Sequence, residues 1–462
     1  MSRGSGKKFI LAIKSPGISP HELFNQIRSA EHCFLLESGM PHGNLSRYSI
    51  MGANPFFTLK GKGGSAGAPL HALKTFFNKY REAETIPGIP YNGGAVGFLG
   101  YNLNSTLEEK VKPFHPDRPV LPDLYFMFMD SGAVFDHIND SLFIFALPIV
   151  SAKRAEEKFD ALKAAYEKAL SLKSCLKAEN LKTKKMSGKG IVRKKYLTDK
   201  KDYLASIKKA KKYISAGDIY EVNLSHRMEI ECSKKPWDVY LSLRAGDPTP
   251  FAAYMKFGKL TIVSASPERF LSLRGDNLET RPIKGTMPRG KTIAQDKRLS
   301  EKLGSSVKNR AENIMIVDLS RNDIGRVCDF GSVKAEKLME IEGYSRVFQM
   351  VSTISGKLSK GKDAFDCIRA CFPGGSMTGT PKIRAMQIIE ELEPVRRGIY
   401  SGSLGYISFN GDMDLNIIIR TLVFWRGKAY LQVGGAIVAD SNPEKEYMET
   451  MYKAESLLEA LK

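Results

Sequence analysis

The sequence predicts an α+β fold in which antiparallel strands dominate. Apolar residues recur at every second position in several segments, Gly-Asp or Arg-Gly pairs separate many of these segments, and amphipathic helical segments lie between and after them. Short turns between alternating segments are typical of antiparallel hairpins. With 462 residues, of which 42% are hydrophobic, the chain is long enough to bury a large core. Long antiparallel strands with flanking helices are characteristic of the α+β class.

The first region, residues 1–150, is expected to mix helices and strands. A helix is predicted over 21–30, and strands are predicted over 33–38, 93–101, 123–137 and 141–150. The Gly-rich segment 61–69 is predicted to be a loop. It lacks the Lys-Ser/Thr ending of a phosphate-binding loop, so we assign no phosphate-binding role to it.

The second region, residues 151–195, carries much of the net charge of +20. Residues 151–212 together hold 20 Lys+Arg and 7 Asp+Glu. The region begins as a predicted helix whose apolar face is formed by Phe159, Leu162, Tyr166 and Leu170. The Lys-, Gly- and Ser-rich stretch that follows is interpreted as an exposed linker. Because the aromatic residues lie on the apolar face, a solvated linker is favoured over nucleic-acid binding; a basic docking surface is the alternative.

The third region, residues 196–462, is expected to contain most of the strands. A helix capped by Thr198 or Asp199 and ended by Gly217 opens it. Strands are predicted over 251–266, 269–285, 402–411 and 413–435, and helices over 296–319, 381–394 and 442–462.

Several classes of protein are excluded by composition. No apolar run approaches the ~20 residues of a membrane-spanning helix, and the longest candidate, Leu142 to Val150, is interrupted by Pro148. The N-terminus lacks the apolar core of a signal peptide. Six cysteines without tight spacing do not suggest a disulfide framework, and Cys367 and Cys371 are expected in the core. We therefore expect a cytoplasmic protein that binds neither membrane nor nucleic acid.

Carboxylates on two predicted helices could hold a metal ion. Glu312 lies on one helix, and Glu446, Glu449 and Lys453 lie at i, i+3 and i+7 on the last one, so these three project from one face. Two carboxylates can hold Mg²⁺, with water and substrate oxygens as its other ligands. An ordinary salt-bridged helix surface is the alternative. Spacing alone favours that alternative.

A lysine and two glycine-rich turns are further candidates. If Lys284 points inward from its predicted strand, burial lowers its pKa, and a neutral amine is a nucleophile. A solvated lysine is the alternative. Segments 372–382 and 432–441 are read as Gly-Gly turns whose backbone N–H groups could bind a carboxylate.

Several long motifs occur in a characteristic order between about residue 200 and residue 455: GDIYEVNLSHR, SPERF, RPIKGTMPRG, RAENIMIVDLSRNDIGRV, CFPGGSMTGTPKIRAM, IRT, GGAIVADS and EYMETMYKA. In these motifs the chain resembles the chorismate-utilising enzymes, and FLLES, SRYSIMGANP and YNGGAVGFLGY extend the resemblance into the first region. The resemblance implies an anthranilate synthase component I-like fold, an α/β sandwich of large antiparallel sheets packed face to face with outer helices. The active site would lie between the sheets, closed by the helices that carry Glu312 and Glu449.

One residue points to a branch of this family. Anthranilate synthases typically have alanine within Pro-Ile-Ala-Gly-Thr, whereas this chain has Lys284, as aminodeoxychorismate synthases component I often do. For that branch, the resemblance implies that Lys284 attacks C2 of chorismate while Glu268 helps the C4 hydroxyl to leave. Ammonia then adds at C4 to give 4-amino-4-deoxychorismate, a precursor of para-aminobenzoate and folate. The alternatives are an anthranilate synthase or other chorismate enzyme and, from another class, a non-catalytic basic nucleic-acid-binding protein.

The resemblance also implies the binding residues and partners. It assigns Mg²⁺ to Glu312 and Glu449, with Glu446 acting through metal-bound water. Substrate contacts are implied for Thr286, Gln349, Tyr400, Arg420, Gly434, Gly435, Ala436 and Lys453. The chain lacks a glutaminase motif, so a separate glutamine amidotransferase subunit is expected to supply ammonia. FLLES and SRYSIMGANP resemble the tryptophan pocket of relatives, which makes a bound tryptophan in the first region a further expectation.

Four positions depart from the family pattern. Asn309 replaces an acidic residue, which would weaken metal binding, and Gln349 stands where anthranilate synthases carry a histidine, so it cannot titrate. Ala436 replaces a glycine, which would make a positive φ costly. Glu221 replaces the usual glutamine. Lys382 matches a family lysine to which no role is assigned.

Overall fold

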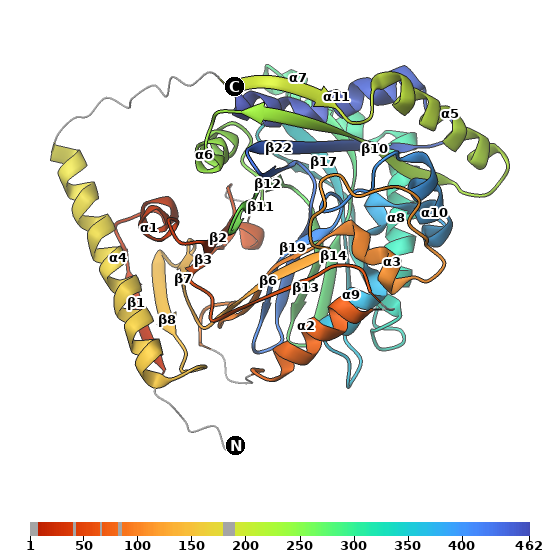
Figure 1. The fold of residues 1–462 in the computed structure, drawn as a ribbon. Coiled ribbons are helices and arrows are strands. Elements are labelled where there is room, and N and C mark those ends of the chain that lie inside the picture. Colours follow the sequence, from red (N-terminus) through yellow and green to blue (C-terminus); the bar gives the residue numbers. More distant parts are fainter. Residues whose placement is uncertain (1–7, 40–42, 65–66, 82–85, 179–189) are drawn as a thin grey trace.

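The structure is a computed structural model that describes residues 8–39, 43–64, 67–81, 86–178 and 190–462. Two large sheets dominate it, one of 12 strands and one of 10, and helices lie outside them (Figure 1). Neighbouring strands in both sheets pair antiparallel, for example Phe34 with Met255 and Tyr406 with Val96. The predicted α+β class and antiparallel sheets are confirmed.

The first sheet combines strands from both ends of the chain. Its order is β1 (Phe9–Lys14), β8 (Ser141–Ala146), β7 (Ser131–Asp136), β3 (Tyr48–Ala53), β2 (His32–Glu37), β11 (Phe251–Phe257), β12 (Leu260–Ser266), β21 (Thr421–Trp425), β22 (Lys428–Ile437), β10 (Glu221–Cys232) and β18 (Gly379–Thr380), and β9 (Ile191–Tyr196) also pairs with β10. Pairing of β2 with β11 joins the first and third regions in one sheet.

The second sheet is assembled in the same way. Its order is β15 (Ile283–Pro288), β17 (Val347–Lys357), β14 (Asn277–Arg281), β13 (Arg269–Arg274), β20 (Met413–Ile417), β19 (Ser403–Ser408), β5 (Gly94–Leu99), β6 (Leu124–Met129) and β4 (Phe57–Gly61), and β16 (Lys334–Gly343) pairs with β17. Here β5 and β19 make the contact between regions. Neither sheet is completed by one region alone.

Helices cover the outer faces of both sheets (Figure 1). On the first sheet pack α1 (Pro20–Ile27), α4 (Ala152–Ala178), α5 (Lys200–Ser215), α6 (Pro236–Gly246), α10 (Lys382–Leu392) and α11 (Pro443–Leu461). On the second sheet and against one another pack α2 (Ala68–Asn78), α7 (Ile293–Gly304), α8 (Val307–Gly325) and α9 (Ala364–Cys371). The short helices are α3 (Asn104–Leu107) and the 3₁₀ turns Gly43–Ser46, Tyr101–Leu103 and Gly375–Met377.

The largest core lies between the sheets. Fully buried side chains from the first sheet, such as Phe34, Met255 and Ile262, belong to the same cluster as Phe98 and Leu415 of the second. Removing this much apolar surface from water is the main driving force for folding. The face-to-face packing implied by the resemblance is therefore present.

Three local expectations are resolved. The helix predicted over 296–319 is two helices, because the chain breaks at Ser305 and the Ser306 hydroxyl caps α8 by accepting from the N–H of Asn309. Part of the expected linker, Ile191–Tyr196, is instead an edge strand, while residues 179–189 lie outside the described residues. The cap at Asp199 is confirmed.

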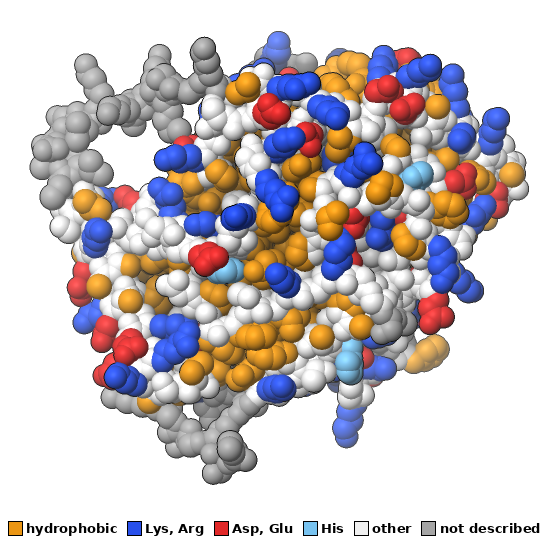
Figure 2. All heavy atoms as spheres, in the orientation of Figure 1, with side chains coloured by type: hydrophobic (Ala, Val, Ile, Leu, Met, Phe, Trp, Pro, Cys, Tyr) orange, Lys and Arg blue, Asp and Glu red, His pale blue; other side chains and the backbone are white. Residues whose placement is uncertain are grey.

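The surface charges and the helices concern two alternatives considered above, binding to nucleic acid and insertion into a membrane. On the face drawn in Figure 2, Lys and Arg side chains are spread widely, with Asp and Glu side chains among them. Among the described residues, no helix combines the length and the apolar composition needed to cross a membrane. The longest, α4, packs on β7 and β8 through one face, where Ala155, Leu162 and Ala169 are buried.

Candidate active site

The candidate site lies where the chain crosses from one sheet to the other. Strand β12 of the first sheet ends at Ser266, and β13 of the second sheet begins at Arg269. Glu268 occupies the crossing and is only 4% exposed. Its backbone is fixed on the second sheet, because its carbonyl accepts from the N–H of Ile417 at 3.0 Å.

The Glu268 carboxyl is held by two donors. Oε1 accepts from the Ser376 hydroxyl at 2.7 Å and from the backbone N–H of Ile283 at 3.3 Å. Burial nevertheless raises its pKa to about 7, because few groups compensate the charged form. A carboxyl with this pKa exchanges protons readily near neutral pH, which suits a general acid or base. Sequence reasoning missed Ser376, although it singled out the turn that contains it.

Lys284 lies one residue beyond the Ile283 N–H that contacts Glu268. It is buried, as the inward-pointing prediction required, but it forms an ion pair with Glu221 of β10. The predicted fall in its pKa is wrong: burial acts to lower the pKa, but the Glu221 charge and hydrogen bond outweigh burial and raise it. We call Glu221, Glu268 and Lys284 the lysine cluster; it joins the two sheets.

A distortion in β15 sets the position of Lys284. The register between β15 and β17 shifts between Ile283 and Thr286, which is the signature of a β-bulge. Gly285 has φ +93°, and a Cβ there would lie 3.1 Å from the Cβ of Asn309. Only glycine tolerates both constraints. The bulge therefore depends on Gly285 and on the close approach of α8.

The three helical carboxylates lie near the lysine cluster without forming one tight group. Burial raises the pKa of Glu312, and the charges of Glu221 and Glu446 raise it further. Burial and then the charge of Glu449 raise the pKa of Glu446. The pKa of Glu449 is lowered, because Lys453 lies 2.8 Å away and outweighs burial. Mutual repulsion of this kind is relieved by a bound cation.

The metal prediction can be tested against this arrangement. No group of three or more His, Cys, Asp or Glu side chains converges as a metal-binding cluster within the described parts of the chain. Mg²⁺ commonly takes only one or two protein carboxylates and fills its octahedron with water and substrate oxygens. The largely buried Glu312 and Glu446 and the more exposed Glu449, on α8 and α11, repel one another in this way and fit that donor set. Lys308, 3.7 Å from Glu312, is the nearby cation that a metal would have to outcompete.

Residues Gly434 to Ala436 form part of a strand rather than the predicted turn. They pair with β10 at Ser225, Leu224 and Asn223. Strand β21 pairs with β22 only as far as Leu431, so the other edge of β22 is open beyond that point among the described strands. Lys453 reaches this edge and donates to the carbonyl of Gly434 at 3.2 Å.

Glycine is required at 434 but not at 436. A Cβ at Gly434 would lie 2.6 Å from the carbonyl oxygen of Leu224 and 2.9 Å from Oδ1 of Asn223. Ala436 does not have a positive φ. The expected backbone cost of alanine at that position is therefore wrong, because the segment is an extended strand.

Buried polar atoms without a hydrogen-bond partner surround this edge and the lysine cluster. They are Oε2 of Glu221, Oδ1 of Asn223, Oε1 of Gln349 and Oγ1 of Thr380. Gln349 lies opposite Thr286 across β15 and β17. Buried polar groups are normally paired, so each of these exceptions indicates a place for a polar ligand or water. The sequence carried no signal for Asn223 or Thr380.

Two expected substrate contacts are not joined to the cluster by any hydrogen bond or ion pair among the described residues. Arg420 has φ +48° and pairs with Asp247 at 3.2 Å. Tyr400 is buried beside Arg397, whose guanidinium lies 5.9 Å from the ring centroid. Lys382 pairs with Asp323 at 2.5 Å and donates to the carbonyl of Cys371. These contacts indicate that Lys382 stabilises the fold and does not bind substrate.

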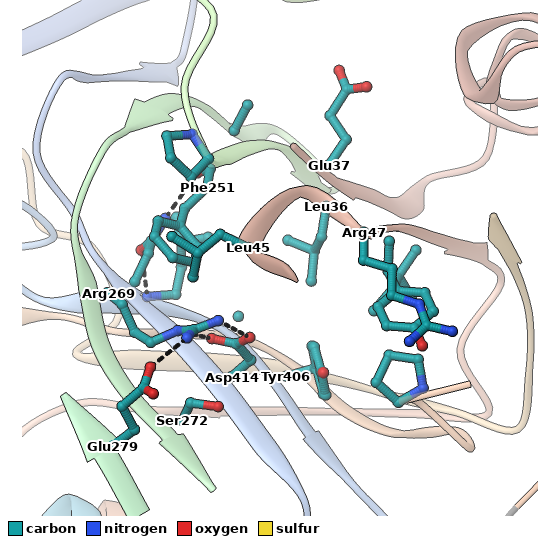
Figure 3. Close-up of a pocket in the computed structure, with 18 of the residues that line it drawn as sticks. Leu36, Glu37, Leu45, Arg47, Phe251, Arg269, Ser272, Glu279, Tyr406 and Asp414 are labelled. Atoms are coloured by element: carbon teal, nitrogen blue, oxygen red, sulfur yellow. Dashed lines mark hydrogen bonds and ion pairs between the residues drawn. The ribbon is translucent and has the colours of Figure 1, made fainter. Parts of the chain in front are cut away.

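A separate cavity of about 350 Å³ lies between strands of both sheets. Leu36, Glu37 and Arg47, from the segments expected to form a tryptophan pocket, line it (Figure 3). Arg269, the neighbour of Glu268, points into it and pairs with Glu279 at 2.7 Å and Asp414 at 3.0 Å. We call it the inter-sheet cavity.

Comparison with known proteins agrees with this architecture. Residues 31–459 match a family model described as chorismate binding enzyme. The chain is 38% identical to anthranilate synthase component 1 of Acetivibrio thermocellus, covering 96% of this chain and 92% of that protein. It is 39% identical to aminodeoxychorismate synthase component 1 of Bacillus subtilis (strain 168), covering 94% and 92%.

Solved structures give the same result for the fold. Anthranilate synthase component I from Streptococcus pneumoniae TIGR4 superposes with a TM-score of 0.76 at 32% identity, over 91% of this chain and 94% of that one. The menaquinone-specific isochorismate synthase from Escherichia coli superposes with a TM-score of 0.74 at 17% identity, over 99% and 95%. The latter likeness concerns the fold alone.

Proposed function

Because this chain belongs to the chorismate-binding enzyme family, we propose that it converts chorismate and ammonia to 4-amino-4-deoxychorismate. Membership makes it a chorismate-utilising enzyme, and relatives of both aminating types occur at similar identity. The observation that carries the finer proposal is the buried Lys284, in contact with Glu221 and one residue from the backbone N–H that holds Glu268. A lysine in this place can be a nucleophile toward the ring.

The proposed reaction uses Lys284 and Glu268 in two steps. The neutral amine of Lys284 bonds to C2 of chorismate, the ring double bonds shift, and the C4–O bond breaks. Glu268 gives its proton to the departing oxygen, which leaves as water. Ammonia then bonds to C4, the double bonds shift back, and the C2–N bond to Lys284 breaks. The new ammonium group returns a proton to Glu268, which restores the enzyme.

Binding of the substrate carboxylates is assigned to the surrounding residues. The open edge of β22 at Gly434 to Ala436, with Lys453 beside it, suits one carboxylate. Thr286 lies on the same bulged strand as Lys284 and is assigned to the same carboxylate. Arg420 and Tyr400 are assigned to the enolpyruvyl carboxylate, which requires Arg420 to exchange Asp247 for the substrate. Mg²⁺ held by Glu312 and Glu449 would offset the negative charge of the ring carboxylate.

Two partners belong to the proposal. A glutamine amidotransferase subunit would supply ammonia, as expected for proteins named component 1 of such enzymes. Tryptophan would occupy the inter-sheet cavity, whose volume of about 350 Å³ lies within the range of small-molecule sites. Glu37 and the Arg269 network would be the polar groups near it.

An anthranilate-forming reaction is the second candidate, since relatives so named are as similar as the aminodeoxychorismate enzyme. Product identification decides between the two. We expect chorismate, Mg²⁺ and ammonium to give 4-amino-4-deoxychorismate, identified by mass spectrometry and by its conversion to para-aminobenzoate with an added lyase. Fluorescent anthranilate as the product would contradict the proposal. Boiled enzyme and reactions without ammonium are the controls.

A further inference from the structure

The ion pair between Lys284 and Glu221 is the one contact in the lysine cluster that the proposed reaction does not explain. Glu221 is completely buried at the start of β10, and Lys284 is 8% exposed in the opposite sheet. A buried pair of this kind holds the lysine as an ammonium ion. An ammonium ion has no lone pair and cannot attack carbon. In this structure Lys284 is therefore protonated and cannot act as a nucleophile.

We propose that Glu221 keeps Lys284 protonated in the resting enzyme and accepts its proton when chorismate occupies the site. This inference rests on the proposed nucleophilic role of Lys284. Glu221 is a positioning residue with respect to the substrate, because it acts through Lys284. As a result, Lys284 is a neutral amine only when chorismate is bound.

The geometry supports a short proton path. Glu221 and Lys284 share a direct hydrogen bond, so the proton moves along one contact. The second oxygen of the carboxylate, Oε2, is buried and has no partner, so the neutral acid can form without breaking another bond. Lys284 keeps 8% exposure, so bound substrate would exclude the remaining water from its ammonium group and favour the neutral pair. The proton returns to Lys284 after the amine is expelled, so the transfer balances over a cycle.

Other charged groups that act on Lys284 are Glu312 and Glu268. Neither forms an ion pair with it among the described residues, and burial favours the protonated, neutral form of both. The Glu221 charge is therefore the main force that holds the proton. A variant with an amide in place of this carboxylate should leave Lys284 as a neutral amine, because burial then acts without an opposing partner.

Lysine reactivity measured without chorismate tests this directly. The full-length protein is treated briefly with acetic anhydride at pH 7.5, and Lys284 acetylation is followed by peptide mass spectrometry. We expect E221Q to label Lys284 at least about tenfold faster than the wild type, which corresponds to a fall of about one unit or more in its pKa. E221D keeps a carboxylate and should label nearly as slowly as the wild type. Equal rates in E221Q and wild type would overturn the proposal.

A matched control separates this effect from loosened packing. Asp130 is 1% exposed and pairs with Lys158 of α4, which packs on β1, β7 and β8 and not on the strands of the lysine cluster. D130N removes a buried carboxylate in the same way and should leave the Lys284 rate unchanged. If D130N accelerates Lys284 labelling as much as E221Q does, general opening of the fold is responsible and the proposal fails.

Turnover gives a second readout. E221Q should still turn over chorismate within about tenfold of the wild type, since its lysine needs no activation. A folded E221Q that labels quickly but has lost turnover would overturn the proposal, because the carboxylate would then be needed in a later step. If the wild type forms no 4-amino-4-deoxychorismate, the proposed function fails, whereas the labelling result still reports whether Glu221 holds the proton.

Discussion

Glu268 and Arg269 are adjacent in the chain, yet they face two very different environments. Glu268 lies in the lysine cluster, where burial raises its pKa to about 7 and buried polar atoms lack partners. Arg269 lines the inter-sheet cavity and is paired with both Glu279 and Asp414. Glu268 is the last residue of the crossing and Arg269 is the first residue of β13, and successive side chains of an extended chain point in opposite directions, so this short segment serves both environments. Buried charged and polar groups that lack partners mark the site of chemistry. Buried charges that are paired, such as Arg269, mark a site of stability or binding.

The largest expected effect comes from removing the nucleophile. We expect Lys284→Ala to lower the rate of 4-amino-4-deoxychorismate formation by at least about 1,000-fold, because the first step of the proposed reaction then lacks its nucleophile. Steady-state assays with saturating ammonium measure it. Full product formation by this variant at the wild-type rate would show that ammonia, not Lys284, attacks the ring.

Replacing Glu268 should come next. Glu268→Gln is expected to lower kcat by about 100- to 10,000-fold, the usual range for a general acid or base. In the wild type the first step needs the protonated form, so kcat should fall as pH rises through about 7. Thermal unfolding gives an independent check. Because burial raises the pKa of Glu268 above its ordinary value of 4.5, the stability that the protonated form contributes is present below about pH 4.5 and is lost as the pH rises to about 7. Relative to wild type, Glu268→Gln should therefore be more stable at pH 8 than at pH 5; the reverse order would contradict the pKa.

Replacing Arg269 should change the stability of the fold and not the rate of the reaction. Arg269→Met leaves Glu279 without its cation and leaves Asp414 with Arg274 alone, at 3.6 Å, and breaking a largely buried pair costs about 3–5 kcal/mol. Urea unfolding measures the loss. Glu279→Gln, which removes only one partner, is the matched variant and should cost less. An Arg269→Met protein of wild-type stability would mean that the environments of Glu268 and Arg269 do not differ as described.

The smallest effect is expected at the metal ligands. Glu449→Gln should raise the Mg²⁺ concentration needed for half-maximal rate by about tenfold or more, since one of two carboxylate ligands is lost. Titration of Mg²⁺ at fixed chorismate measures it. Glu444, exposed on the first turn of α11, supplies the control substitution Glu444→Gln. An unchanged Mg²⁺ requirement in Glu449→Gln would remove this residue from the metal site.

Much of the fold and part of the site could be predicted from the sequence. The alternation of apolar and polar residues, together with turn residues, predicted most strands. The family motifs identified Lys284 and Glu268. The ion pair with Glu221 could not be foreseen from local pattern, because it joins β10 and β15, 63 positions apart in the chain. The strand at Gly434 to Ala436 was not predicted for a related reason. A Gly-Gly pair is locally typical of a turn, whereas here it permits a close approach to Leu224 on a neighbouring strand.

A covalent adduct tests the central claim most directly. The enzyme is mixed with chorismate and Mg²⁺ without ammonia, so that the first step proceeds and the second cannot. Intact-protein and peptide mass spectrometry are expected to show a gain equal to chorismate minus one water, located on Lys284 and absent from Lys284→Ala. Product formation on adding ammonia, with no adduct at Lys284 at any time before it, would contradict the account.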